Sequence, residues 1–294
     1  MRITDTMLYT NASTSIDLAR SNVNTATEES SSGLRVTQPG DDPAAAAGVI
    51  IHSAAESFAT SVQQTATAAV DELQTASGAL NSVSTALTTA RELAVQMSND
   101  TYNATDRADA AAQVGQIFNE VVAALNTKSG DRYVFGGSQD QTPPFDASGN
   151  YNGDTEVRTI EVAPGVQQPA SLRADVAITG AGGGTNVLAA LTAFQTALTN
   201  NDTTGIEAAV GALQTGTSQV AQLISQAGGD MDALSTAATV AQATTLSETK
   251  DVSNLQDADV VTAATQLQMA QTALQAALAA STQSFKFSLL DQSG

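Results

Sequence analysis

The sequence predicts a mainly α protein, in which the N- and C-terminal segments form a long antiparallel helical bundle, or coiled-coil rod, around a small β-rich inserted domain. Near both ends, apolar residues recur at alternating intervals of three and four, which is the heptad spacing of paired helices. Only 4% of the residues are aromatic and Trp is absent, which disfavours large sheets. Residues 133–183 hold four of the six prolines, which locates the insert.

The two terminal stripes have the same spacing and the same alternation of small and larger side chains. The first helix is expected from about Thr4 to Glu29, and its stripe consists of Tyr9, Ala12, Ile16, Ala19, Val23 and Ala26. The matching stripe near the C-terminus consists of Val260, Ala263, Leu267, Ala270, Leu274 and Ala277. Because half of each stripe is alanine, one helix alone hides little apolar surface, and we expect the two ends to pair.

A hinge is expected after the first helix, because Ser30–Gly33 interrupts the helical pattern and two prolines follow. Asp41 or Asp42 is suited to cap the next helix, with Pro43 at its first position, where a missing N–H is tolerated. We call this hinge the signature loop, and the residues in it that we single out are Gly33, Arg35, Pro39, Asp41, Asp42 and Pro43.

Beyond the hinge, the pattern predicts one very long helix over Pro43–Met97 and a second helix that ends near Leu125. Thr105 is expected to cap the second helix, with Asp106 and Asp109 in its first turn. Because the loop between them is short, the two helices should be antiparallel neighbours.

The insert is expected to contain three short strands, at Tyr133–Phe135, Thr155–Val162 and Asp175–Thr179. Helical periodicity returns at Val187–Leu198, and Thr204 with Glu207 resembles a capping box. A last helix should begin after Gly228 and Gly229, loosen over Thr249–Asp257 and lead into the C-terminal stripe. We therefore expect three domains: residues 1–42 with 254–294 as a terminal coiled-coil assembly domain, 43–132 with 184–253 as a helical rod domain, and 133–183 as a β-rich outer domain.

The composition excludes several classes of function. A net charge of −19 repels phosphate backbones and anionic lipid, so neither nucleic acid nor a membrane surface is an expected partner. There are no cysteines, which excludes disulfides, iron–sulfur clusters and thiol chemistry. We expect no membrane insertion, because no run of eighteen apolar residues exists, and no cleavable signal, because Met1–Asn11 lacks a basic and an apolar region.

No catalytic constellation, cofactor site or metal site is expected. His52 is the only histidine and has no apparent triad partner, so packing or an interhelical hydrogen bond is its expected role; with no cysteine, a zinc site is not expected. Oxygen-bearing residues alternate from Asp146 to Asp154 as in a calcium loop, but Tyr151 and Val157 replace the required Gly and Glu. The acid pairs Asp41-Asp42 and Asp257-Asp259 lie beside helix starts and are interpreted as caps.

Five separated motifs resemble the bacterial flagellins and flagellar hook-associated proteins. SSSGLRVTQPGDDPAAAAG (Ser30–Gly48) resembles the N-terminal signature of that family, and DADVVTAATQLQMAQTALQAALA with SLLD (Asp257–Ala279, then Ser288–Asp291) resembles its C-terminal signature. RELAVQMSNDTYNATDR (Arg91–Arg107), and NTKSGDRYVFGGSQDQTPPFD with YNGD from Asn126 onward, are similar to the hook-associated proteins of the hook–filament junction rather than to flagellin.

This resemblance implies a non-enzymatic structural protein located outside the cell in the flagellum, at the hook–filament junction. It implies export in an unfolded state by flagellar type III secretion, and as partners a cytoplasmic export chaperone, other copies of itself, a neighbouring hook-associated protein and flagellin. The expected assembly interface is formed by Tyr9, Ile16, Val23, Val260, Leu267, Leu274, Leu278, Phe285, Phe287, Leu289 and Leu290.

Three alternatives compete with this interpretation. A minor flagellin subunit of the filament is the nearest, and it would form long filaments when purified. A helical sensory ectodomain would need a membrane span, and an extracellular hydrolase would need a cluster of acid, base and nucleophile; neither feature is found in the sequence.

Overall fold

The computed structural model describes residues 5–291, with side chains given for Met7 and for residues 9–283. Its long helices are α1 (Asp5–Ser32), α2 (Pro43–Met97), α3 (Ala104–Leu125), α4 (Val187–Thr199), α5 (Thr203–Gln256) and α6 (Val260–Asp291). The chain divides into two compact units, of which unit 1 comprises Met1–Phe58 and Thr244–Gly294, and unit 2 comprises Ala59–Ala243.

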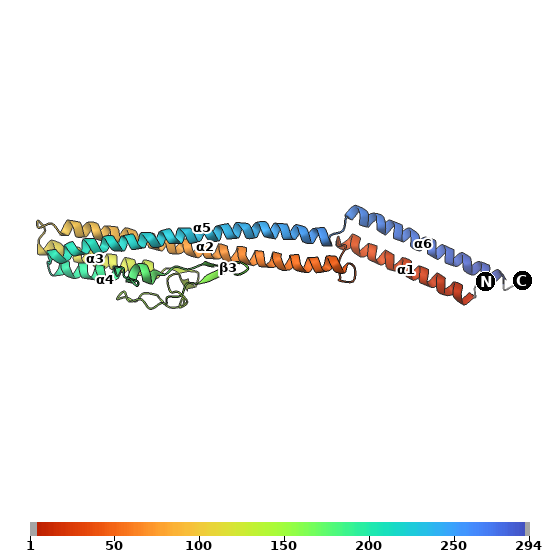
Figure 1. Ribbon diagram of the computed structural model, residues 1–294, viewed down its shortest axis with the longest axis horizontal. Helices are drawn as coiled ribbons and strands as arrows, with labels where there is room; N and C mark the ends of the chain where they lie inside the picture. Colours follow the sequence, from red (N-terminus) through yellow and green to blue (C-terminus); the bar gives the residue numbers. More distant parts are fainter. Residues whose placement is uncertain (1–4, 292–294) are drawn as a thin grey trace. The chain divides into compact units, whose positions relative to one another are not determined.

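In unit 1, α1 and α6 lie side by side and run antiparallel, so that the start of α1 and the end of α6 lie at the same end of the pair (Figure 1, red and dark blue). Most residues of both predicted stripes face the seam between the helices: Ala19, Ala26 and Ala263 are buried, and Ile16, Val23, Leu267 and Leu274 are half-buried. The predicted pairing of the two chain ends is therefore confirmed.

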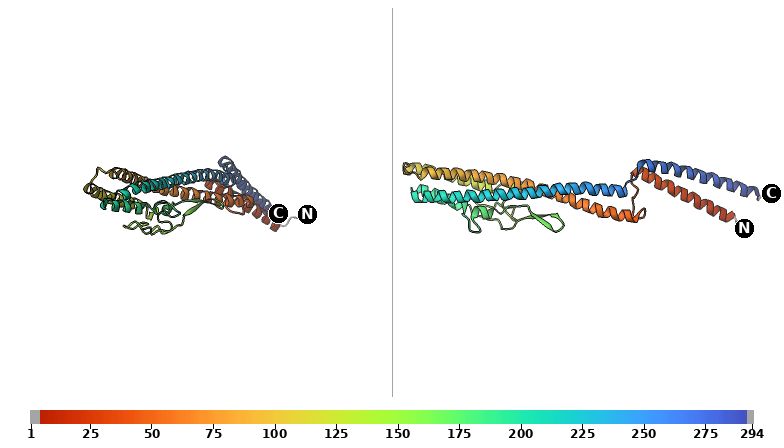
Figure 2. Two further views of the ribbon diagram at one scale, coloured as in Figure 1. Left: turned by 60° about the vertical axis from the view of Figure 1, so that its left-hand side comes forward. Right: turned by 45° about the horizontal axis from the view of Figure 1, so that its top comes forward.

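In unit 2, α3 and α4 lie against the long helices α2 and α5 (Figure 2). All four helices contribute to one core, whose largest fully buried side chains are Phe135, Phe145, Phe194, Leu73, Leu80, Leu87, Leu125, Ile178, Leu191, Leu198, Ile206 and Leu213. The long helix α2 begins and ends at the residues that its periodicity predicted.

The segment between α3 and α4 contains little β structure. Its two antiparallel hairpins pair β1 (Lys128–Ser129) with β2 (Arg132–Tyr133) and β3 (Thr159–Ala163) with β4 (Val166–Pro169). The strand predicted at Asp175–Thr179 is wrong, because these residues form a short π-helix, η1. Neither of the two hairpins in the described part of the chain pairs with this segment, and Thr179 Oγ1 donates to the Asp175 carbonyl at 2.6 Å.

Three predicted helix boundaries are also wrong. Asn103, not Thr105, caps α3: its side chain accepts from the N–H of Thr105 and Asp106, and Asp106 accepts from the N–H of Asn103 in return. The helix α5 begins at Thr203, so Thr204 lies inside it rather than at its cap. The same helix continues unbroken through Gly228 and Gly229, since packing outweighs the roughly 1 kcal/mol that each glycine costs relative to alanine.

Candidate functional site

The signature loop connects α1 to α2 and begins with a glycine in the left-handed conformation. Gly33 has φ +73°, a value that glycine adopts without steric cost, and its N–H donates to the Glu29 carbonyl at 3.0 Å. The chain then turns toward the end of α5. Leu34 forms an antiparallel bridge with Asp257, and the Gly33 carbonyl accepts from the Ala258 N–H at 2.8 Å.

Arg35 fastens this loop to the end of α5. Its Nη1 lies 3.1 Å from Asp42 Oδ2, and its Nη2 donates to the Leu255 carbonyl at 2.7 Å. The N–H groups of Arg35 and Val36 both donate to the Gln256 carbonyl, at 2.7 and 3.2 Å. The sequence marked Arg35 as part of a motif, but no local pattern indicates a partner 220 residues away.

The two adjacent aspartates of the loop have separate structural roles. Asp42 Oδ1 accepts from the Ala45 N–H at 3.0 Å and caps α2, so the predicted cap with Pro43 behind it is present. Asp41 Oδ2 accepts from the N–H groups of Thr37 and Gln38 at 3.0 Å. These backbone donors are the main reason why the pKa of each carboxyl lies below its ordinary value, the Gln38 N–H for Asp41 and the Ala45 N–H for Asp42. Both aspartates are therefore suited to hold the turn in place rather than to exchange protons near neutral pH.

The terminal helix pair leaves large apolar side chains exposed. Of the predicted interface residues, Tyr9, Val260 and Leu278 are 63%, 69% and 42% exposed, so much of each side chain is left uncovered by the α1–α6 pair. Met7, Leu18, Val261 and Met269 are also exposed, and on α6 these residues point away from the seam in several directions. The side chains of Phe285, Phe287, Leu289 and Leu290 lie outside the described residues.

Exposed apolar side chains are unevenly distributed between the two units. Among the described residues, eleven of the fifteen exposed large hydrophobic side chains belong to unit 1, although unit 2 is the longer unit. The largest fully buried side chains, in contrast, all belong to unit 2. Unit 2 thus contains the large buried core, whereas most of the exposed large apolar side chains lie in unit 1.

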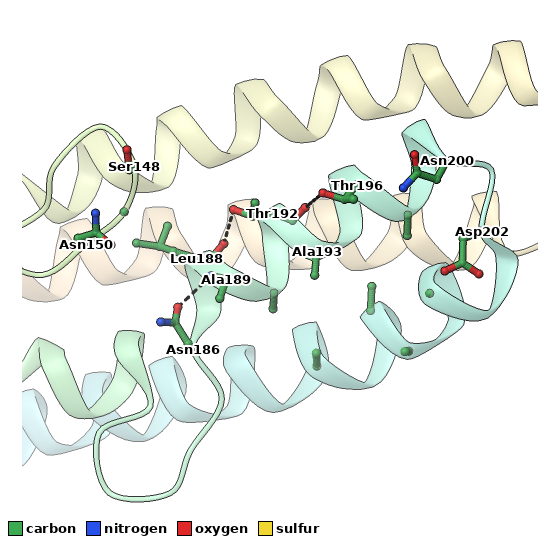
Figure 3. A pocket seen from close by; sticks show the side chains of 17 residues that line it. Ser148, Asn150, Asn186, Leu188, Ala189, Thr192, Ala193, Thr196, Asn200 and Asp202 are labelled. Atoms are coloured by element: carbon green, nitrogen blue, oxygen red, sulfur yellow. Dashed lines mark hydrogen bonds between the residues drawn. The ribbon is translucent and has the colours of Figure 1, made fainter.

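A groove of about 770 Å³ lies between the 148–150 turn, α4 and the start of α5 (Figure 3). Seven of the seventeen residues that line it are alanine, and Asp202 is the only charged residue among the seventeen. Its polar groups satisfy local backbone groups: Asn186 accepts from the Ala189 N–H, and Thr192 donates to the Leu188 carbonyl. This lining offers no paired acid and base and no activated nucleophile.

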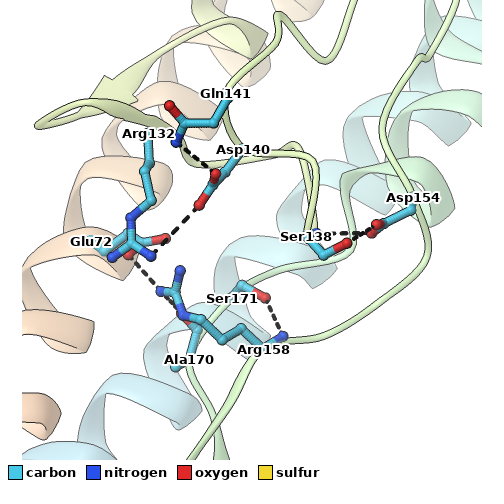
Figure 4. A network of polar contacts seen from close by, with 9 residues as sticks. All are labelled: Glu72, Arg132, Ser138, Asp140, Gln141, Asp154, Arg158, Ala170 and Ser171. Carbon is cyan, nitrogen blue, oxygen red and sulfur yellow. Dashed lines mark hydrogen bonds and ion pairs between the residues drawn. The ribbon is translucent and has the colours of Figure 1, made fainter.

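A polar network fixes the strand-bearing segment to α2 (Figure 4). Arg158 Nη2 lies 2.5 Å from Glu72 Oε2 on α2 and 3.1 Å from the Ala170 carbonyl. The Ser171 hydroxyl accepts from the Arg158 N–H at 2.9 Å, and Asp154 accepts from the Ser138 N–H at 2.9 Å. Each charged group in this network is paired with an opposite charge or with a backbone group. The network therefore stabilises the position of the strand-bearing segment against α2.

None of the helices, over the part of the chain that is described, combines the length and the apolar character needed to cross a bilayer.

Comparison with known proteins shows what the chain is similar to. Residues 3–140 match the bacterial flagellin N-terminal helical region. Over 164 residues the chain is 32% identical to flagellar hook-associated protein 3 of Salmonella typhimurium. This aligned region covers 55% of this chain and 52% of that protein. A flagellin from Clostridium tyrobutyricum is 36% identical over 130 residues, 43% of this chain and 34% of that protein. The chain thus spans about half, or less, of the length of these relatives.

The fold has a solved counterpart as well. A structure from Vibrio parahaemolyticus, described as that of a flagellar hook-associated protein, superposes with a TM-score of 0.67 and covers 74% of this chain and all of the other. At 20% identity this likeness concerns the fold alone. It supports the mainly α architecture with a small strand-bearing segment.

Proposed function

Since residues 3–140 match the bacterial flagellin N-terminal helical region and the chain resembles flagellar hook-associated protein 3, FlgL, we propose that it is a structural protein of the flagellum that joins the hook to the filament. In this role it contacts a neighbouring hook-associated protein on one side and flagellin on the other, outside the cell. It carries out no reaction and needs no cofactor.

The observation that carries the proposal is the concentration of exposed apolar side chains in unit 1. The seam of the α1–α6 pair buries mostly alanine and half-covered aliphatic residues, so little free energy is available to offset the entropy of ordering two long helices. In the assembly, contacts with neighbouring subunits bury the apolar side chains that the α1–α6 pair leaves exposed. Contacts in which one face meets a different face of the next subunit extend into an open, repeating assembly.

The parts of the chain divide the work. The terminal segments 1–42 and 254–294 form the assembly domain, and the signature loop anchors them to α2 and α5 through Arg35 and Asp42. The helical segments 43–132 and 184–253 transmit mechanical load between hook and filament. The insert 133–183 covers the outer surface of the assembled junction. Terminal helices that are incompletely ordered before assembly also suit export of an unfolded chain by type III secretion and retention by a cytoplasmic chaperone.

The test replaces exposed apolar side chains of α6 that point away from α1. In a strain that lacks the gene, we expect the wild-type chain to restore motility, and the double variant Val261→Gln with Met269→Gln to leave hooks without filaments and flagellin in the medium. The two side chains are 77% and 65% exposed, and glutamine favours helix, so the isolated variant should keep the fold of the wild type.

The matched control is Val95→Gln, which changes a 55% exposed apolar side chain on α2 within unit 2. It should restore motility as well as the wild type does. Normal filament attachment by the double variant would refute the role of these outer faces.

The second candidate function is a minor flagellin subunit, which the 36% identity to the Clostridium flagellin favours. The two functions differ in the deletion strain. Loss of a junction protein releases flagellin from intact hooks, whereas loss of a minor subunit leaves filaments attached. Polymerisation of the purified protein into long filaments would favour the flagellin role.

A further inference from the structure

Three metal-ligating side chains from two helices of unit 1 lie together near the signature loop. His52 projects from α2, and Glu248 and Asp251 project from α5, where a spacing of three places them on one face. His52 Nδ1 lies 2.6 Å from Glu248 Oε2, and the candidate ligand atoms of all three residues lie within 4.8 Å of one another. Of the two roles expected for His52, packing or an interhelical hydrogen bond, the hydrogen bond is present, and it involves only one of the two carboxylates.

The cluster is partly buried and has unbalanced charge. The side chains of His52 and Glu248 are 34% and 20% exposed, and Asp251 is also partly buried. The carboxylate of Asp251 has no hydrogen-bond or ion-pair partner among the described residues. With a neutral imidazole the three groups carry two negative charges side by side, in a chain whose net charge is −19. A bound cation would offset both the repulsion and the partial desolvation.

We propose that His52, Glu248 and Asp251 form a binding site for a divalent transition-metal ion of the zinc class, which clips α2 to α5 beside the signature loop. The imidazole selects zinc over calcium or magnesium, which take oxygen ligands. Three protein ligands leave a fourth tetrahedral position for water. The proposed flagellar function does not depend on this site.

The geometry fits such an ion after small side-chain rotations. Zinc–ligand distances near 2.1 Å in a tetrahedron place ligand atoms roughly 3.4 Å apart. The contact between His52 and Glu248 must open from 2.6 Å, and the widest pair must close from at most 4.8 Å. A metal bound at Nδ1 replaces the proton there, and the neutral ring then carries its hydrogen on Nε2. One residue beyond Glu248, Thr249 Oγ1 donates to Glu56 Oε1 at 2.9 Å, so a second hydrogen bond joins α2 and α5 next to the cluster.

The sequence alone disfavoured a zinc site, since the chain has one histidine and no cysteine. The structure changes this assessment, because it adds two carboxylates from a segment about 200 residues away. Because the chain has only one histidine, the site is easy to test. Every imidazole signal of the protein belongs to His52.

The experiment titrates the full chain with Zn²⁺ at pH 7.5 in a non-coordinating buffer, monitored by calorimetry and by the imidazole ring signals in proton NMR. We expect one ion per chain, a shift of the His52 ring signals, and a melting temperature that rises with Zn²⁺. His52→Gln, which retains a hydrogen-bond donor for Glu248, should weaken binding by about tenfold or more and abolish the thermal shift.

Two further variants separate this site from general carboxylate binding. Asp251→Asn should weaken binding in the same way as His52→Gln, whereas Glu56→Gln, one helical turn beyond His52 on α2, should bind as the wild type does. The proposal is overturned if the ring signals do not move at saturating Zn²⁺, or if His52→Gln binds Zn²⁺ as tightly as the wild type. It is also overturned if size-exclusion chromatography shows that binding occurs only when two chains are bridged.

Discussion

At the residue scale, single polar side chains hold irregular segments of the chain in place. Arg35 joins the signature loop to the end of α5, and Arg107, only 3% exposed, donates to the carbonyls of Met97 and Asn99 and to Asn201 Oδ1. Buried donors of this kind are expensive to leave unpaired, since an unsatisfied group costs about 1–3 kcal/mol. The loops therefore have defined positions although they contain few apolar side chains.

Tyr151 has the same role in the strand-bearing segment. Its hydroxyl lies 2.8 Å from the Asp154 carbonyl and 3.1 Å from the Phe135 carbonyl, and its ring lies against Phe145, with 5.1 Å between the centroids. Burial, followed by the negative charges of Asp175 and Asp154, raises the pKa of Tyr151 to about 12. The folded state thus favours the neutral phenol more strongly than the unfolded chain does.

This difference predicts an alkaline loss of stability. A raised folded-state pKa contributes stability that is complete below pH 10 and is lost as the pH rises from about 10 to about 12. We expect Tyr151→Phe to be less stable by about 1 kcal/mol at pH 7, because the hydroxyl contacts are lost, and to lose less stability than the wild type between pH 10 and 12. Urea unfolding at pH 7, 10 and 11.5 measures both effects.

The matched control is Tyr133→Phe, which removes another phenol of the same segment. Its stability should fall with pH in parallel with that of the wild type, since Tyr151 remains. Parallel curves for Tyr151→Phe and the wild type would show that the alkaline transition has another source.

At the element scale, small residues at the seam decide how closely α1 and α6 approach. Ala263 is 2% exposed and Ala264, the next residue on α6, is exposed. We expect Ala263→Leu to force the helices apart at a cost of about 1–3 kcal/mol, and Ala264→Leu to change little, because leucine is also a good helix former. Hydrogen exchange measured by mass spectrometry should show faster exchange in both α1 and α6 for the first variant only. Faster exchange confined to α6 would contradict direct packing of Ala263 against its partner helix.

The helical elements could be predicted from the sequence because their apolar residues recur with a period that only a helix satisfies. The stripes on α1, α2 and α6 are of this kind, and α2 has the predicted ends. Where local signals compete, prediction failed: Thr105 was expected to cap α3 although Asn103 caps it, and Val176 and Ile178 suggested a strand where the chain forms a π-helix. Packing against residues distant in the sequence determines the local structure at both positions. Such packing leaves no periodic pattern in the sequence.

The candidate sites were less predictable than the fold for the same reason. The signature loop was recognisable as a motif, and a cap at Asp41 or Asp42 beside Pro43 was predicted, of which the structure shows Asp42. The contact of Arg35 with Leu255 and the meeting of His52 with Glu248 join segments about 200 residues apart. Such contacts follow from the register of α2 against α5, which spacing within either helix does not determine.

At the scale of the whole molecule, stability is concentrated in unit 2. Among the residues whose side chains are described, every fully buried large side chain belongs to that unit, and each contributes about 1.5–3 kcal/mol of transfer free energy. Unit 1 buries mainly alanines along one seam and a small cluster of Val36, Ala45 and Ala46 with Leu255. Local opening should therefore occur in unit 1 at a much lower free energy than in unit 2.

Limited proteolysis of the isolated chain tests this difference. Thermolysin cleaves beside large apolar residues, and we expect the first cuts in Met1–Phe58 and Thr244–Gly294, where most exposed apolar side chains lie, leaving a resistant product close to Ala59–Ala243. Mass spectrometry of the early products locates the cuts. Digestion of the urea-unfolded chain is the control, since it should cut throughout unit 2 and so prove that cleavable bonds exist there. Equal resistance of both units in the native chain would mean that the terminal helices are fully stable alone, and burial against neighbouring subunits would then not be needed to order them.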